Sequence, residues 1–499
     1  MNLLDDPWIP VRADDGSGPF SLITYRKLLC EAGTWRISLP RDDLELACIQ
    51  LLVSMTQVLF QPGDDDMLED QLESPLKESV FDVGIAPCRD WFDLDHPTQP
   101  FMQTRGVASK EITPIQKLLI GLPEGNNHCF FNQTGEVTAL SAPIAAIALF
   151  HQATNCPSFG GGFKGSLRGI APITTLVDGA NLREQVWRNV LTLERTLKEL
   201  PWTRDLSDEQ PTWIDPIKAG QTIYPHQIGL LRGLFWQPAH VELIPTPETG
   251  PCDLLGIDAG PRYTGFRKEK FNFTLDGTWP HPHGAMSISI KKGQSETKFA
   301  SFTTTAPAWT RLTELVVRKN ADRGEGNRPA LAIGQARALD IYTLHLLVGG
   351  YRNKQASVLE RRHELIELGD GWDNEVGRLE DLVDIGNRAR DILFHKLMFA
   401  AMGHKEKKLP GIGAPIQKTG ERLFYARTEE RIIATFSDSA TFSEWQQHLD
   451  TYAADLAAEC VAIFNELTDP YTMKPELIPI IAWAGRSLIA DLRKLKEGK

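Results

Sequence analysis

The chain has 499 residues, a formal net charge of −12, and a composition that is 42% hydrophobic and 24% charged. These values are ordinary for a globular protein and leave room for two or three domains. The acidic balance argues against a free-standing, sequence-indifferent nucleic-acid binder, because phosphate neutralisation favours a basic protein.

The cysteines and the apolar runs indicate a cytoplasmic protein. Seven cysteines are scattered singly, and no C-x-x-C pair occurs, which is typical of reduced thiols in a cytosol. No apolar run approaches the roughly 18 residues that span a membrane. The first residues also lack the basic and apolar regions of a secretory signal. We expect a cytoplasmic protein with no membrane partner.

The first part of the chain mixes helical and strand patterns. Residues 44–60 are apolar on nearly all sides and predict a buried helix. The adjacent aromatics in Phe130-Phe131-Asn132 predict a loop, because neighbouring rings cannot both face one core from a regular strand. Core packing of both rings is the open alternative. Residues 144–153 predict an apolar helix, residues 172–177 a strand, and residues 181–200 one amphipathic helix.

A glycine-rich stretch lies between that apolar helix and that strand. It reads Ser158-Phe159-Gly160-Gly161-Gly162-Phe163-Lys164-Gly165-Ser166-Leu167-Arg168-Gly169. Consecutive glycines permit positive φ and close approach, and Lys164 and Arg168 add positive charge. This pattern suits a phosphate or the floor of a nucleic-acid groove, with a flexible surface loop as the alternative.

The context of this stretch excludes two nucleotide-binding motifs. The dinucleotide fingerprint requires a strand before the glycines and a helix after them, and here the order is reversed. The P-loop requires lysine after its last glycine, where this chain has Ser166. We therefore expect no nucleotide cofactor.

Residues 210–302 have a β-rich pattern, and Asp276-Gly277 predicts a hairpin turn between strands at 271–275 and 286–290. Helical patterns return at 308–319 and 329–348. Four amphipathic helices are then predicted at 375–402, at 420–436, from Thr441 (with Glu444 as a capping box) to about 467, and after Pro470. The expected fold is α+β, with a mixed α/β domain over 1–370 and a four-helix bundle over 371–499.

Catalytic and metal-binding patterns are weak. His281-Pro282-His283 lacks a nearby cluster of further ligands, and Cys252 stands alone, so no metal is expected. No nucleophile elbow, metalloprotease or kinase motif occurs. Two further segments combine cations with glycine and aromatic residues, 262–270 (with Lys268) and 349–357 (with Lys354). Aromatic rings and cations in alternation are typical of segments that stack on bases and contact phosphates. For each segment alone, however, an exposed hairpin is the more common interpretation.

At these residues the chain resembles the CasA family, the large subunits of the type I-E CRISPR surveillance complex Cascade. The resemblance runs essentially from end to end. Its motifs are Asn2-Leu3-Leu4, Trp8-Ile9-Pro10-Val11, Leu39-Pro40-Arg41-Asp42-Asp43, Pro100-Phe101-Met102-Gln103-Thr104, Phe159-Gly160-Gly161-Gly162-Phe163-Lys164, Gly233-Leu234-Phe235-Trp236-Gln237-Pro238-Ala239-His240, Tyr263-Thr264-Gly265-Phe266, Trp279-Pro280-His281-Pro282-His283 and Tyr351-Arg352-Asn353-Lys354-Gln355-Ala356-Ser357.

The resemblance implies a non-catalytic subunit that recognises the protospacer-adjacent motif (PAM) in duplex DNA and starts strand separation beside it. It also implies a docking surface for a nuclease-helicase that is recruited later in antiviral defence. The implied partners are the other Cascade subunits (the small-subunit dimer and the guide-RNA backbone subunits), the CRISPR guide RNA and double-stranded target DNA. Two alternatives stay open: an enzyme that holds a phosphorylated small molecule in the glycine loop, and an assembly scaffold.

The resemblance also implies roles for residues. A PAM minor-groove contact is implied for Ser158, Phe159, Gly160, Gly161, Gly162 and Lys268, a strand-separating wedge for Lys354 and Gln355, and an anchoring loop near the guide RNA for Phe130, Phe131 and Asn132. This chain departs from relatives in three places. Ser158 stands where family members can have glycine, Lys354 replaces an amide, and Cys252 is the one cysteine left of a cluster that could bind zinc.

Overall fold

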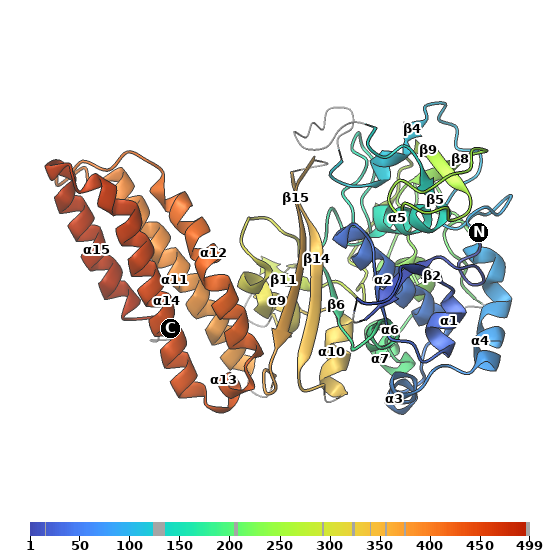
Figure 1. The fold of residues 1–499 in the computed structure, drawn as a ribbon, viewed down its shortest axis with the longest axis horizontal. Coiled ribbons are helices and arrows are strands. Elements are labelled where there is room, and N and C mark those ends of the chain that lie inside the picture. Colours follow the sequence, from blue (N-terminus) through green and yellow to red (C-terminus); the bar gives the residue numbers. More distant parts are fainter. Residues whose placement is uncertain are drawn as a thin grey trace. The chain divides into compact units, whose positions relative to one another are not determined.

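The computed structural model describes residues 1–14, 16–122, 135–203, 208–291, 294–321, 325–339, 341–354, 357–373 and 376–495 (Figure 1). By internal contacts the chain divides into two compact units. The first comprises 1–304, 314–340 and 346–365, and the second comprises 305–313, 341–345 and 366–499. The mixed fold class with a helical C-terminal region is confirmed. The boundary at residue 370 and the roles given to its two sides remain predictions.

Two buried helices form the centre of the first unit. Helix α2 (Asp42–Leu59) is buried from Asp43 onward except at the half-buried Glu45, and α5 (Ala142–Thr154) is buried along its whole length. A helix that is apolar on all sides has to be covered on all sides. Accordingly α2 packs against α5 and against α6 (Leu182–Arg188). These contacts fix the position of the C-terminal end of α5, where the glycine stretch begins.

The other elements are shorter. The further helices are α1 (Tyr25–Cys30), α3 (Asp65–Glu73), α4 (Glu78–Ile85), α7 (Leu193–Glu199), α8 (Leu230–Leu234), α9 (Leu312–Val316) and α10 (Leu331–Ala338). Short 3-10 helices are η1 (Ala86–Phe92), η2 (Ile115–Leu118), η3 (Pro225–Gln227), η4 (Ala308–Arg311), η5 (Asp469–Tyr471) and η6 (Pro475–Leu477).

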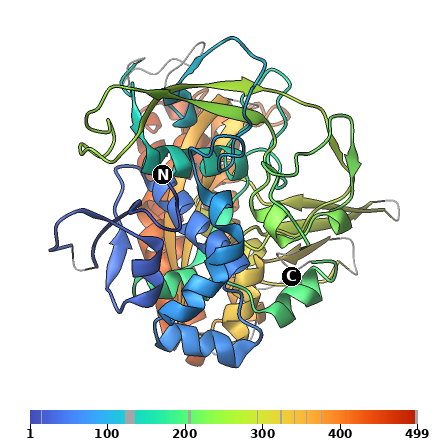
Figure 2. The same ribbon diagram turned by 90° about the vertical axis from the view of Figure 1, so that its right-hand side faces the viewer.

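The strands of the described residues form small sheets. One has the order β2 (Ser21–Ile23), β1 (Ile9–Ala13), β3 (Trp35–Ile37), and another has β12 (Gln294–Phe299), β11 (Met286–Lys291), β13 (Glu325–Arg328). In a third, β9 (Arg262–Glu269) pairs with β4 (Thr113–Pro114), β5 (Leu140–Ser141) and β8 (His240–Thr246). The fourth has the order β15 (Ser357–Leu368), β14 (Leu344–Lys354), β6 (Thr174–Val177). Figure 2, turned from Figure 1, shows α5 in teal beneath the green strands β8 and β9.

The second unit is built on four long helices that pack along one another (Figure 1). They are α11 (Val376–Met402), α12 (Ile416–Ser437), α14 (Trp445–Thr468) and α15 (Ile478–Leu492), with the short α13 (Ser439–Ser443) before α14. In α11, the first of the four predicted amphipathic helices, the apolar face is buried at Leu379, Leu382, Ala389, Leu393 and Ala400. In the described part of the chain, every helix is too short or too polar to cross a lipid bilayer.

Two predicted helices are corrected by the structure. The helix expected over 181–200 is two helices, because Asn189 leaves the helical path and donates its side-chain amide to Val177 O (2.6 Å) and Gln185 O (2.8 Å). Thr192 then caps α7 by accepting from Arg195 N. The helix expected over 329–348 ends at Ala338, since the following apolar residues form β14 and pair with β6.

One predicted turn and one predicted helix cap are also wrong. No hairpin forms at Asp276-Gly277, because β10 (Thr274–Leu275) pairs in parallel with β7 (Thr222–Ile223) and β11 pairs with β12 and β13. The intervening chain instead enters the core. At the start of α13 the cap is Asp438, whose carboxylate accepts from Ala440 N (2.9 Å), and Thr441 is a buried residue inside the helix.

The core segment after Gly277 buries two histidines. His281 and His283 are 2% and 1% exposed, with ring centroids 5.2 Å apart. His283 Nδ1 lies 3.3 Å from Gln50 Nε2, and His281 Nδ1 accepts from His283 N at 3.1 Å. Burial, and the charge of nearby Arg168, lower the pKa of His283 to about 3 and that of His281 well below its ordinary value. Both rings are therefore neutral core residues near neutral pH. Among the described residues, no cluster of three or more His, Cys, Asp or Glu could hold a metal ion.

These neutral histidines predict acid sensitivity. As pH falls from about 6.5 toward 3, the unfolded chain binds a proton on His283 that the folded state excludes, so stability decreases. At about pH 5 the loss from one such group is ~2 kcal/mol. The urea midpoint of His283→Gln should therefore drop less between about pH 7.5 and about pH 5 than that of the wild type.

The same substitution at the exposed His226 controls for removal of one titrating side chain. An identical pH-dependence in the wild type and His283→Gln would contradict the prediction.

Candidate nucleic-acid interface

The glycine stretch connects α5 to β6, as the sequence predicts. Gly160, Gly161 and Gly162 have φ values of +79°, +55° and +87°, a region that glycine adopts without steric cost. Phe163 N donates to Gly160 O at 3.0 Å and closes the turn. Gly161 and Gly162 are exposed, and a Cβ built on Gly161 would meet no atom within 4 Å. The loop therefore presents bare main chain to solvent.

Two lysines from β9 and its end lie against this loop. Lys270 Nζ donates to Gly161 O at 2.9 Å. Lys268 Nζ lies 5.8 Å from the centroid of the Phe159 ring and 5.7 Å from that of Phe266, and it also donates to Thr113 Oγ1. The two rings lie 5.6 Å apart and form the base on which the ammonium rests. The structure thus brings the predicted residues Ser158–Gly162 together with Lys268, although about a hundred residues separate them in sequence.

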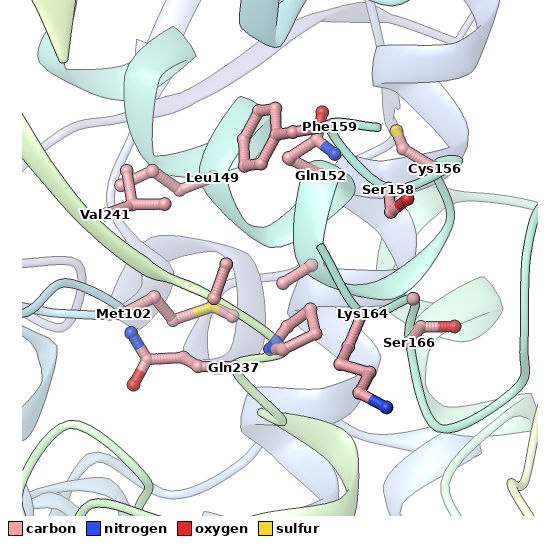
Figure 3. A pocket seen from close by; sticks show the side chains of 14 residues that line it. Met102, Leu149, Gln152, Cys156, Ser158, Phe159, Lys164, Ser166, Gln237 and Val241 are labelled. Atoms are coloured by element: carbon pink, nitrogen blue, oxygen red, sulfur yellow. The ribbon is translucent and has the colours of Figure 1, made fainter. Parts of the chain in front are cut away.

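Behind the loop is a cavity of about 20 Å³, which is room for roughly one water molecule. Its lining includes Phe159, Leu149, Gln152 and Gln237 (Figure 3). A phosphorylated metabolite needs a far larger pocket. The geometry at the back of the loop therefore disfavours the small-molecule alternative.

The two cations inside the glycine stretch differ in what they do. Lys164 is exposed, and Figure 3 shows its ammonium extending away from the ring of Phe159. Arg168, expected as a surface cation, is only 3% exposed. It donates to Asn155 Oδ1, to Thr174 Oγ1 (3.0 Å) and to Thr154 O (3.2 Å), and burial lowers its pKa to about 9. Arg168 is therefore part of the core beneath the loop, which corrects its interpretation as a surface charge.

The second predicted segment, 349–357, lies in a strand pair, since β14 ends at Lys354 and its neighbour β15 begins at Ser357. Gly349 and Gly350 lie inside β14, where a Cβ would come within 2.4 Å of Leu46 Cδ2 and 2.8 Å of Pro172 O respectively. Lys354 ends β14 and is exposed. Gln355 lies outside the described residues, as do Phe130, Phe131 and Asn132. Their predicted roles are therefore not tested by the geometry.

Sequence reasoning did not single out Lys270 as a partner of the glycine loop. A signal was present, since residues two apart on a strand point to the same face, and Lys270 follows Lys268 at that spacing. Ser158, by contrast, uses its hydroxyl locally and accepts from Gly160 N at 3.4 Å. The candidate interface is thus a backbone arch at Gly160–Gly162 that Lys270 holds through Gly161 O, with Lys268 beside it.

Comparisons with known proteins agree with this fold. A curated CasA/Cse1 protein of Thermus thermophilus is 29% identical over 233 residues, which are 44% of this chain and 43% of that protein. The alignment thus spans less than half the length of that relative. Crystal structures of Thermus thermophilus CasA and Thermobifida fusca Cse1 each match with a TM-score of 0.74, at 19% and 18% identity, and the matches cover 99% of this chain and 99% and 98% of those chains.

A chain of a CRISPR RNA-guided surveillance complex matches with a TM-score of 0.68 and 16% identity, over 98% of this chain and 99% of that one. These similarities concern the fold. The family model described as CRISPR-associated protein Cse1 matches residues 2–462, which is most of the chain. The chain therefore belongs to the Cse1 (CasA) family of CRISPR-associated proteins.

Proposed function

We propose that this protein is the non-catalytic large subunit of a type I-E CRISPR RNA-guided surveillance complex in the cytoplasm. It recognises the PAM in double-stranded DNA, initiates separation of the target strands and helps to recruit the nuclease-helicase. Membership of the Cse1 family and the likeness to a chain of a CRISPR RNA-guided surveillance complex support this proposal.

The bare main chain at Gly160–Gly162 beside Lys268 is the observation that carries the proposal. The minor groove of B-DNA is only about 6 Å wide, so a backbone without Cβ atoms enters it more easily than a side-chain surface. A neighbouring lysine can contact a groove-edge acceptor or a phosphate. Because the minor groove presents a degenerate pattern of donors and acceptors, the PAM reading is tolerant.

The proposal gives the other predicted residues separate roles. Lys354 and Gln355 form the wedge at the first separated base pair, and Lys354 adds a phosphate contact there. Phe130, Phe131 and Asn132 anchor the subunit near the guide RNA. An acidic chain with a few local cations suits one subunit of an assembly, in which the small-subunit dimer, the guide-RNA backbone subunits and the guide RNA itself supply the rest of the binding surface.

Substitution of Gly161 tests groove entry. A Cβ on Gly161 meets nothing within the protein, and the strain of alanine at its positive φ (+55°) costs only about 1–2 kcal/mol. Gly161→Ala should therefore fold and assemble, but the added methyl would project toward the DNA. We expect at least tenfold weaker binding of PAM-containing duplex by the assembled complex, measured by mobility shift or interferometry.

Gly256→Ala is the matched control, since Gly256 also has positive φ (+69°) and open space around its Cβ. Equal affinities of Gly161→Ala and Gly256→Ala would refute the placement of the loop in the groove.

Substitution of Lys268 and of Gln355 distinguishes PAM recognition from the later base pairing between target DNA and guide RNA. Lys268→Ala and Gln355→Ala should each weaken closed-duplex binding about tenfold, because a groove contact or a wedge worth about 1.4 kcal/mol is lost. Binding of a target opened in advance should change less than about twofold, since base pairing with the guide carries it. Lys218→Ala, at an exposed lysine of the same unit, serves as the charge control.

Equal losses on the closed and opened targets would argue against these roles. No loss on either target would favour an assembly scaffold.

A further inference from the structure

A run of buried hydrogen bonds connects the glycine loop to the β14–β15 hairpin. It starts at Arg168, whose guanidinium donates to Asn155 Oδ1. The Asn155 amide nitrogen lies 3.2 Å from His151 Nδ1, and His151 Nε2 lies 2.6 Å from the Tyr351 hydroxyl. Tyr351 in turn donates to Asp43 Oδ2 at 2.6 Å. All five side chains are 5% exposed or less.

The direction of donation along this run is the same at every step. Asn155 presents its oxygen to Arg168, which cannot accept, so its amide nitrogen donates to His151 Nδ1. Burial lowers the pKa of His151 to about 4, so the ring is neutral, and its Nε2–H donates to Tyr351. Tyr351 then donates to the carboxylate of Asp43. Bonds aligned between a cation and an anion polarise and strengthen one another.

The carboxylate of Asp43 joins further segments to this run. Arg41 binds it through two hydrogen bonds, Nε to Oδ1 (3.0 Å) and Nη2 to Oδ2 (2.6 Å), and also donates to Ile120 O (2.7 Å). On β15, Arg361 lies 3.8 Å from Asp43 Oδ1 and pairs with Asp42 at 2.6 Å. One buried carboxylate thus holds both strands of the hairpin and the chain just after η2.

Independent contacts link the same segments. An apolar cluster of Cys156, Ala171 and Tyr351, which Ile120 and Val358 pack against, contains residues from both flanks of the glycine loop and from both strands of the hairpin. At the far end of the loop, β6 pairs with β14 through Thr174 and Gly349. Entry and exit of the loop are therefore both attached to β14.

We propose that Tyr351 and Asp43 are positioning residues that hold the glycine loop and the β14–β15 hairpin in one fixed register, so that PAM contact and strand separation act as a unit. This inference rests on the proposed function for its consequence in DNA binding. The mechanical coupling of the two segments stands apart from that function and is tested first.

Hydrogen–deuterium exchange of the full-length chain tests the coupling. Tyr351→Phe deletes the bridging hydroxyl and keeps the buried ring, so amides of both 158–169 and 344–354 should exchange at least about fivefold faster. Tyr25→Phe is the matched control, since Tyr25 is equally buried and its hydroxyl bonds Thr56 Oγ1 (2.8 Å) away from the run.

Faster exchange in only one of the two segments, in neither, or equally in Tyr25→Phe would overturn the inference. His151→Gln breaks the run one step earlier and should give the same paired increase, so the coupling remains testable if Tyr351→Phe folds poorly.

Target binding by the assembled complex tests the consequence. Tyr351→Phe should weaken closed-duplex binding about tenfold and pre-opened binding less than about twofold, whereas a loss of folding would lower both. Combined with Lys268→Ala, it should cause less loss than the product of the two single effects, because both act on one interface. Losses that multiply would mean independent action and would overturn the inference.

The two proposals fail in different ways. If Lys268→Ala leaves duplex binding intact, the proposed PAM contact is wrong, whatever the exchange data give. If Lys268→Ala weakens binding but Tyr351→Phe behaves like Tyr25→Phe, only the positioning role is wrong.

Discussion

The buried carboxylate of Asp43 is the constraint on which the arrangement of the candidate interface depends. A charge removed from water is stable only where it is paired and fully hydrogen-bonded. Asp43 meets this need with Arg41 beside it in sequence and with Tyr351, which lies 308 residues further along the chain. Arg41 and Tyr351 hold the pKa of the Asp43 carboxyl down to about 2 despite its burial. Satisfying one charge thus requires the hairpin, α2 and α5 to meet at one point.

Arginine and lysine are used differently around this point. Arg168 and Arg362 are buried and the Arg41 side chain is only 10% exposed, and each guanidinium donates to carbonyls or carboxylates inside the first unit. The lysines at the loop are more accessible, since Lys270 is exposed and Lys268 is half-buried. This division follows from chemistry, because the guanidinium forms several fixed hydrogen bonds at once and tolerates partial desolvation better than an ammonium. The net charge of −12 therefore says little about the charge at the interface.

The elements that were predicted correctly from the sequence are those whose formation depends on local hydrophobic periodicity. The all-round apolar run at 44–60 and the stripes of the long C-terminal helices identify α2, α11 and α15 without knowledge of their partners. The prediction of a hairpin at Asp276-Gly277 was wrong because β10 and β11 each pair with other strands, and local sequence does not determine which strands pair. The prediction that Arg168 is a surface cation was wrong for a similar reason. Local sequence does not say whether a cationic side chain is exposed to solvent or buried in the core. The association of Lys268 with the glycine loop came from family resemblance, since no spacing rule joins residues that far apart.

Three adjacent glycines would ordinarily make a segment with a large conformational entropy. Here the arch is braced by the bond from Phe163 to Gly160 O and by the Lys270 ammonium on Gly161 O, and its base is fixed by α5 and β6. A loop ordered before its ligand arrives loses less freedom on binding, which is a gain in affinity that requires no further contact. The hydrogen bond between Lys270 and Gly161 thus preorganises the backbone of the arch. It restricts the conformations of the glycines while their main chain stays exposed.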